Sequence, residues 1–187
     1  MTAPSARELP NTAGPKGDWL HQASDRVARM VATSKNRSVD TLRPGDIAEL
    51  RRLNPGDPVA PSFWKLLNSL EDLVRLPASG NQLAEQERRW ACFFNAAAIL
   101  SDLHRRDVPL GLALAKAELS EIRFVRLLRA EEHHLFVEVR HTARFLAAKG
   151  QVVDIYGFAL LLMSDGTDFQ ESVRRNTARS YYSNITQ

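Results

Sequence analysis

Residues 82–106 read QLAEQERRWACFFNAAAILSDLHRR, the longest stretch of helical character in the chain. The middle of this stretch, residues 90–100, is almost wholly apolar, and the charged residues lie toward its two ends. A helix that is apolar on every side is buried among other elements. We therefore expect residues 82–106 to form one long central helix around which the rest of the chain packs.

The segments on both sides of this central helix are also helical in pattern. Pro, Gly and N-capping residues mark their ends, and no stretch alternates with the period of two that a half-buried strand shows. The sequence predicts an all-α bundle of about eight helices. The expected helical segments, of which 132–149 continues directly from 121–131, span residues 18–34, 44–53, 61–76, 82–106, 110–117, 121–131, 132–149, 155–165 and 169–185, with Asp18, Ser120 and Asp154 as caps.

The domain organisation leaves two alternatives open. Residues 1–17 hold three prolines and little apolar sequence, so we expect a disordered tail there. Residues 18–187 then form a single helical domain, or two lobes over residues 18–106 and 107–187.

Composition sets limits on the class of protein. The chain has 187 residues, of which 44% are hydrophobic and 25% charged, as in ordinary globular domains. Its one cysteine, Cys92, excludes an intramolecular disulfide. There is no secretion signal and no apolar run of about 20 residues, so the sequence predicts a soluble, cytoplasmic protein without membrane attachment.

An arginine-rich helix is the clearest functional signal. Residues 120–132 read SEIRFVRLLRAEE, in which Arg123, Arg126 and Arg129 recur every three residues. At 100° per residue the interleaved Phe and Leu side chains share the other face of the helix. Guanidinium groups suit phosphate because their planar fork can bind two oxygens at once. The alternative is a charged face that only contacts water.

The positive charge of the chain is concentrated around this helix. The formal net charge is +3, and residues 123–149 carry six Arg or Lys against three Glu, which accounts for all of it. A sequence-independent grip on a nucleic-acid backbone depends on such local concentration more than on the overall charge.

Two further basic groups occur outside residues 120–132. Alternatives within the chain exist for some members, because Arg51 or Arg52 could pair with Asp46 or Glu49, and Arg175 with Glu171. If the groups converge in space, they would bind a phosphate backbone without reading its sequence. The first group is Lys35, Arg37, Arg43, Arg51 and Arg52, and the other is Arg174, Arg175 and Arg179.

Catalytic patterns are not found. The glycines occur singly, so no phosphate-binding loop is expected, and Cys92 lies in an apolar context that makes it a poor nucleophile. A metal-dependent enzyme built around His133, His134 and His141 is the remaining catalytic alternative, but adjacent residues of a helix diverge by about 100°. We therefore expect a protein that is not an enzyme and has no cofactor.

Three motifs, in order along the chain, resemble the CasB family. They are GDIAELRRLNPGDPVAPSFWKLL at residues 45–67, LGLALAKAELSEIRFVRLLRAEE at 110–132 and RRNTARSYY at 174–182. The chain departs from the family pattern at Thr177, where relatives often carry tryptophan, and at Met163 and Ser164, where a tryptophan is also common. The packing of the last two helices is therefore expected to differ.

The resemblance implies an all-helical, non-catalytic small subunit of the type I-E CRISPR complex Cascade, which acts in antiviral defence. It implies as partners the backbone and large subunits, a second copy of the chain, the hybrid of CRISPR RNA and target DNA, and the displaced strand. The subunit would stabilise the R-loop, while Phe63, Trp64, Phe124, Leu127 and Leu128 would belong to the core. The expected nucleic-acid contacts are Arg51, Arg52, Arg123, Arg126 and Arg129, followed by Arg43, Lys35, Arg37, Arg174 and Arg175. A purely structural adaptor that binds only protein subunits is the alternative.

Overall fold

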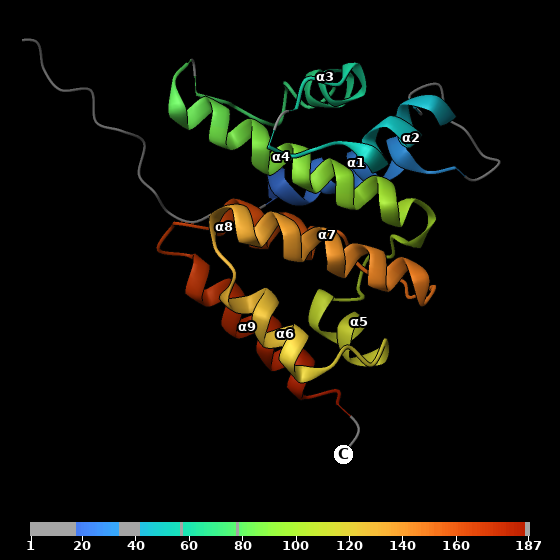
Figure 1. Cartoon of the computed structure of the whole chain (residues 1–187), viewed down its shortest axis with the longest axis vertical. Helices are drawn as coiled ribbons and strands as arrows, with labels where there is room; N and C mark the ends of the chain where they lie inside the picture. Colours follow the sequence, from blue (N-terminus) through green and yellow to red (C-terminus); the bar gives the residue numbers. More distant parts are fainter. Residues whose placement is uncertain (1–17, 34–41, 57, 78, 186–187) are drawn as a thin grey trace, which may run out of the picture.

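The computed structural model describes residues 18–33, 42–56, 58–77 and 79–185, and the expected tail at 1–17 lies outside them (Figure 1). Over these residues the chain forms nine α-helices, one short 3-10 helix and no β-strand, which confirms the all-α prediction. The elements are α1 (Asp18–Val31), α2 (Pro44–Arg52), α3 (Pro61–Asn68), α4 (Asn81–Leu100), the 3-10 helix η1 (Ser101–Leu103), α5 (Leu110–Lys116), α6 (Glu121–Arg129), α7 (Glu132–Ala148), α8 (Tyr156–Ser164) and α9 (Gln170–Tyr182).

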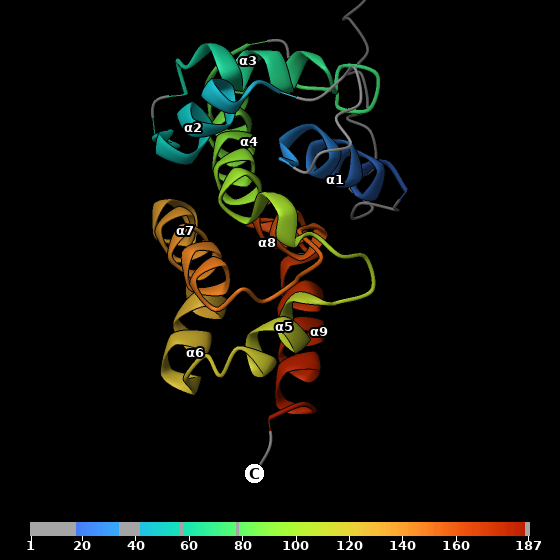
Figure 2. The same cartoon turned by 90° about the vertical axis from the view of Figure 1, so that its right-hand side faces the viewer.

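Helix α4 is the central element, as its sequence predicts. Every residue from 89 to 98 is buried, so the helix is enclosed on all sides. It packs against α7 on one side and against α1 and α8 on another, while α2 and α3 contact it from above in the view of Figure 1 (Figures 1 and 2). The run of three alanines at 96–98 allows close approach of neighbouring helices, because small side chains keep the helix axes near one another.

Aromatic side chains fill the core beside α4. Trp90 and Phe93 meet edge to face with ring centroids 5.8 Å apart, and Phe94 lies 5.7 Å from Phe63 of α3. These rings are at most 1% exposed. Burial of such large side chains supplies the main hydrophobic stabilisation of this half of the molecule.

Two expected helices end earlier than their sequence pattern indicates. Helix α4 stops at Leu100, because the residues after η1 turn away to pair with Val153, whose N–H donates to Leu103 O at 2.9 Å. Helix α3 stops at Asn68, where Ser69 Oγ donates to Leu66 O at 2.6 Å. A serine hydroxyl bonded to the preceding turn competes with helix continuation. Both errors come from contacts that hydrophobic periodicity does not report.

The helices after α4 form a second layer below it (Figure 1). Helix α5 packs tightly on α9, and α7 and α8 return to α4. Helix α4 of the first expected lobe, 18–106, shares its core with α7 and α8 of the second, 107–187. The division into two lobes stays a prediction.

A partly buried polar cluster joins α1 to the segment before α8. His104 Nε2 lies 3.5 Å from Asp25 Oδ1, and its Nδ1 accepts the N–H of Ile155 at 3.4 Å. Arg106 Nε donates to the same Asp25 oxygen at 2.9 Å. Burial lowers the pKa of His104, with nearby His21 acting in the same direction and Asp154 opposing it. At neutral pH the neutral form of the His104 imidazole is therefore favoured.

This cluster predicts a loss of stability at mildly acidic pH. Since the pKa of His104 in the folded state lies below its ordinary value of 6.5, the unfolded chain binds the proton more readily. The free energy of unfolding should fall as pH drops below about 6.5 toward the folded pKa, and be unaffected by this residue above that range. Urea unfolding of the wild type and of His104→Gln, followed across this range, checks it. Equal pH dependence in the two proteins would contradict the assignment.

Candidate nucleic-acid interface

Helix α6 is attached to the molecule by its apolar face. Phe124 is fully buried and stacks on Tyr181 of α9, with ring centroids 3.7 Å apart and planes 16° from parallel. Tyr181 Oη donates to Leu119 O, at the residue before Ser120. Ser120 precedes the helix with extended backbone but makes no capping bond through its side chain. Leu127 is buried beside Phe124, so the arginines are left on the outer side.

The three arginines of α6 are all exposed, as the helical spacing predicts. Arg123 and Arg126 line a groove of about 500 Å³ between α6 and α7. We call this the α6–α7 groove. Its lining consists of Leu119, Arg123, Arg126, Glu138, His141, Thr142, Arg144 and Phe145. Arg129 stands outside it, at the C-terminal end of α6.

One carboxylate enters this groove. Glu138 Oε1 lies 2.8 Å from Nε of Arg126. Arg123 and Arg144, by contrast, form no hydrogen bond or ion pair with any other described residue. The groove therefore presents two uncompensated guanidinium groups and one that is paired.

Helix α7 contributes Arg144 and His141, neither of which is among the expected nucleic-acid contacts, although the sequence places Arg144 in the basic group that follows α6. Both are exposed, and they lie three residues apart, so they share one face of α7. The spacing was available in the sequence, but the pairing of α6 with α7 across the groove was not. Arg140, one residue before His141, does not line the groove. It is half-buried, and its Nε has no hydrogen-bond partner among the described residues. Desolvation and the neighbouring Arg144 lower the pKa of Arg140.

The α2 group lies apart from the groove, with α7 between them. Arg51 is bound to the end of α4, where its Nε donates to Ala98 O at 2.9 Å and Nη2 donates to Ser101 Oγ at 3.1 Å. Arg43 and Arg52 are exposed, and the backbone N–H of Arg43 donates to Asp46 Oδ2 at 3.3 Å. The alternative in which Arg51 or Arg52 pairs with Asp46 or Glu49 is wrong: Asp46 accepts from Lys65 Nζ, and Glu49 accepts from the N–H of Ser62. Lys35 and Arg37 lie outside the described residues.

The α9 arginines are partly committed to contacts within the protein. Arg174 Nη2 donates to Ala130 O at 2.9 Å, which satisfies a carbonyl at the end of α6, and Nη1 lies 3.3 Å from Glu131. Arg175 pairs with Glu171 at 2.5 Å, as its spacing predicts, but both side chains are 73% exposed. Arg175 is thus accessible, whereas Arg174 mainly supports α6.

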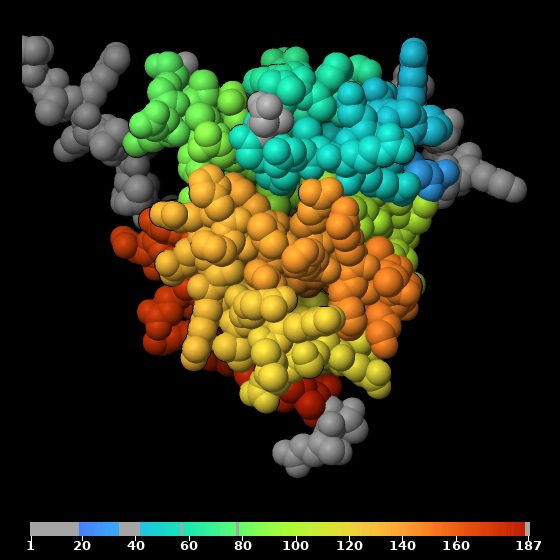
Figure 3. Space-filling view, in the orientation of Figure 1, coloured from blue at the N-terminus to red at the C-terminus, as the bar shows by residue number. Residues whose placement is uncertain are grey.

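The helices that carry the basic groups share a face of the molecule only in part. Figure 3 shows α2, α7 and α6 on one side, with α7 between the other two. The structure brings together Arg123 and Arg126, adds Arg144 and His141, and does not include the α2 arginines in the groove.

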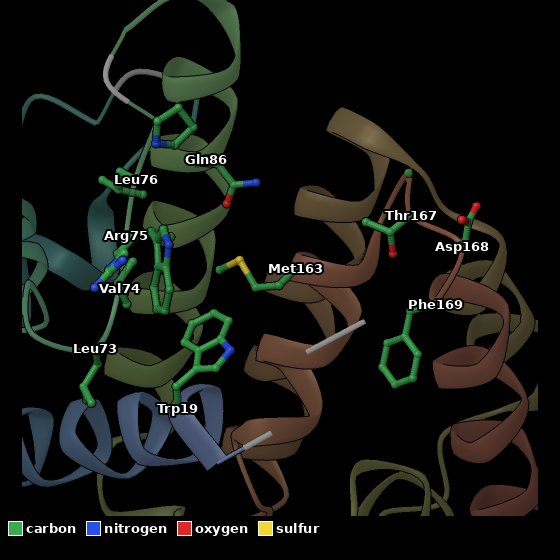
Figure 4. A pocket seen from close by; sticks show the side chains of 13 residues that line it. Trp19, Leu73, Val74, Arg75, Leu76, Gln86, Met163, Thr167, Asp168 and Phe169 are labelled. Atoms are coloured by element: carbon green, nitrogen blue, oxygen red, sulfur yellow. The ribbon is translucent and has the colours of Figure 1, made fainter. Parts of the chain in front are cut away.

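A larger cavity of about 800 Å³ lies elsewhere, between α1, α4 and α8 (Figure 4). Trp19, Leu73 and Met163 enter it from α1, the segment after α3 and α8. Its lining is mostly apolar, with Arg75 and Asp168 among the few charged members. Such a lining suits an apolar side chain rather than a phosphate backbone.

The core assignments of the sequence hold with one exception. Phe63, Phe124 and Leu127 are buried and Leu128 is partly buried, but Trp64 is 41% exposed. Trp64 follows Phe63 directly, so the two rings leave α3 in directions about 100° apart, and only Phe63 faces α4.

The sequence also raises the alternatives of a metal site and a reactive cysteine. No three His, Cys, Asp or Glu side chains within it are placed to hold a metal ion, so the hypothesis of a site at His133, His134 and His141 gains no support. Burial raises the pKa of the Cys92 thiol, which keeps it from forming a thiolate. No described helix combines the length and apolar character needed to cross a bilayer.

Comparison with known proteins gives one match. Residues 46–182 match the family described as CRISPR-associated protein Cse2, and this range contains almost all of the three motifs recognised in the sequence. No curated protein and no solved structure matches the chain. Because the match spans well over half of the 187 residues, the chain belongs to the Cse2 (CasB) family and is a small subunit of the type I-E Cascade complex of CRISPR antiviral defence.

Proposed function

We propose that this subunit binds nucleic acid without catalysis and stabilises target DNA in the R-loop through contacts with the phosphate backbone. The observation that carries the proposal is the α6–α7 groove, where Arg123, Arg126 and Arg144 come together from two helices against one carboxylate. The hybrid of CRISPR RNA and target DNA and the displaced DNA strand are the expected ligands, and the backbone and large subunits and a second copy are the expected protein partners in the cytoplasm.

The chemistry of the groove fits such a role. Guanidinium groups bind phosphate oxygens bidentately, and such contacts with the phosphates carry no information about base sequence. In an RNA-guided complex the guide supplies specificity, and exchange of a DNA duplex for an RNA–DNA hybrid is nearly balanced in free energy. A few backbone contacts by a small subunit can therefore shift the balance toward the open R-loop. Arg52, Arg43, Arg129 and Arg175 are exposed and can extend the contact, whereas Arg51 and Arg174 act mainly within the fold.

Replacement of Arg123 and Arg126 together by alanine tests this function. We expect the double variant to bind single-stranded and duplex DNA at least tenfold more weakly at about 50 mM salt, because two phosphate contacts are lost. The plot of log Kd against log salt should become shallower by about 1.4 for single strands. Fluorescence anisotropy with labelled DNA over a salt series measures both quantities.

A matched control removes the same amount of positive charge from two arginines outside the groove. Arg29 of α1 and Arg105, between η1 and α5, are exposed and outside the lining of the groove, and α1 lies on the side away from α6 and α7 (Figure 2). Their double alanine variant should keep most of the wild-type affinity and salt slope. If the two double variants behave alike, the groove is not the binding site. Melting temperatures near the wild-type value in both would exclude a loss of fold.

A purely structural adaptor is the second candidate. Exposed apolar side chains favour it, since Val59 and Trp64 near α3 are 72% and 41% exposed, and Ile122 of α6 is 81% exposed. Such side chains are typical of contacts with other proteins. An adaptor would show no salt-dependent affinity for DNA in isolation, while Ile122→Ser or Trp64→Ser would weaken its incorporation into Cascade. The DNA titration above therefore separates the two candidates.

A further inference from the structure

We propose that Glu138 is an internal counter-ion that competes with nucleic-acid phosphates for the α6–α7 groove and lowers its affinity for them. This inference rests on the proposed function, because it concerns the same groove. It assigns to a carboxylate of α7 control over the strength of binding, which neither the arginine pattern nor family membership identifies.

The position of Glu138 carries the argument. It lines the same groove as Arg123, Arg126 and Arg144. Its Oε1 lies 2.8 Å from Nε of Arg126, and its side chain is 13% exposed while that of Arg126 is 57% exposed. The carboxylate thus sits on the floor of the groove, and the arginine bridges from it toward solvent. A phosphate bound at the open side of Arg126 would meet this negative charge.

The electrostatics of the pair indicate that Glu138 competes with phosphate for Arg126 and does not assist phosphate binding. A carboxylate in contact with a guanidinium offsets much of its charge, and its limited exposure weakens the screening by water. Among the described residues, Arg126 is the one cation that contacts Glu138, so it supplies the main compensation of the carboxylate charge. When phosphate draws Arg126 away, Glu138 is left partly buried without its partner. Both effects weaken phosphate binding.

This arrangement has a consequence for selectivity. A groove of three uncompensated arginines would bind any polyanion, whereas an internal competitor raises the affinity that a ligand must supply. A phosphate backbone that also contacts neighbouring surfaces exceeds this threshold, since linked contacts act at a high effective concentration. An isolated strand has no such linked contacts, so it must displace Glu138 with the affinity of the groove alone.

Replacement of Glu138 by glutamine tests the proposal, since it removes the charge and keeps the shape. We expect Glu138→Gln to bind single-stranded DNA about fivefold more tightly at about 50 mM salt. The dependence of log Kd on log salt should steepen by up to about 0.7, because Arg126 becomes fully available to one more phosphate. Anisotropy titrations over the salt series provide both values.

A second glutamate substitution controls for net charge. Glu71 is exposed in the turn after α3, outside the groove, and Glu71→Gln changes the charge by the same amount. We expect it to alter the affinity less than twofold. Glu138→Ala serves as the second variant if the glutamine protein folds poorly.

The outcomes separate the two levels of the argument. If Arg123→Ala with Arg126→Ala leaves DNA binding unchanged, the proposed function fails. If that pair weakens binding but Glu138→Gln binds no more tightly than Glu71→Gln, the groove function stands and the competition is refuted. Weaker binding by Glu138→Gln would also overturn it, since the carboxylate would then be a positioning group for Arg126.

Discussion

Gly111→Ala is expected to lower the free energy of unfolding by about 2–3 kcal/mol, as overpacking in a rigid contact does. A Cβ added at Gly111 would lie 2.3 Å from Thr177 O and 2.7 Å from the backbone nitrogen of Tyr181. These atoms belong to the backbone of α9, so they cannot move aside as the end of a flexible side chain would. Helices α5 and α9 must separate to accept the methyl group.

The consequence should extend to the arginine helix. Tyr181 stacks on Phe124 and hydrogen-bonds to Leu119, so a displaced α9 moves the support of α6. Chemical denaturation gives the stability change, and DNA titration shows whether the groove is affected. Gly45→Ala is the matched control, because Gly45 lies in α2 with no atom within 4 Å of the added Cβ. It should be neutral or stabilising by about 0.5 kcal/mol. Equal effects at both glycines would contradict the close-contact explanation.

Arg89→Met is expected to have the largest effect on stability, about 3–5 kcal/mol, because it leaves a buried charge uncompensated. Arg89 Nη1 donates to Leu162 O at 2.8 Å and to the backbone oxygen of Asp165 at 2.7 Å. Its Nη2 lies 3.7 Å from the Asp165 carboxylate, whose side chain is 5% exposed. The arginine therefore satisfies two carbonyls and the Asp165 carboxylate in the interior, and its Nε also donates to Glu85 Oε1 at 3.1 Å.

The Asp165 carboxylate in turn organises the starts of two helices. Its oxygens accept the N–H of Glu132, at the start of α7, at 3.0 Å and the Nε2 of Gln170, at the start of α9, at 2.6 Å. Loss of Arg89 should thus loosen the ends of α7, α8 and α9 together. Urea unfolding measures the effect. Arg88→Met is the control. Arg88 is 37% exposed, and its contact with Glu85 is a long surface pair of 3.8 Å. Such pairs are worth about 0–1 kcal/mol, so a loss at Arg88 as large as at Arg89 would contradict this account.

Sequence reasoning succeeded where a pattern repeats along one helix. The apolar run of 90–100 located the buried helix, and the spacing of Arg123, Arg126 and Arg129 placed them on the exposed side of α6. It failed where the partner comes from elsewhere in the chain. Arg51 has the same sequence context as Arg52, yet it is bound to the end of α4.

The amino-acid sequence by itself determined the all-α class, the helices and the family, because periodicity, helix-ending residues and ordered motifs are local properties of the chain. The tertiary structure decided which charges act together. It placed Arg144 and Glu138 of α7 opposite the arginines of α6, and it bound Arg51, Arg89 and Arg174 to backbone carbonyls. The physical reason is that the availability of a guanidinium depends on the acceptors within about 3 Å of it, and the packing of helices supplies those acceptors.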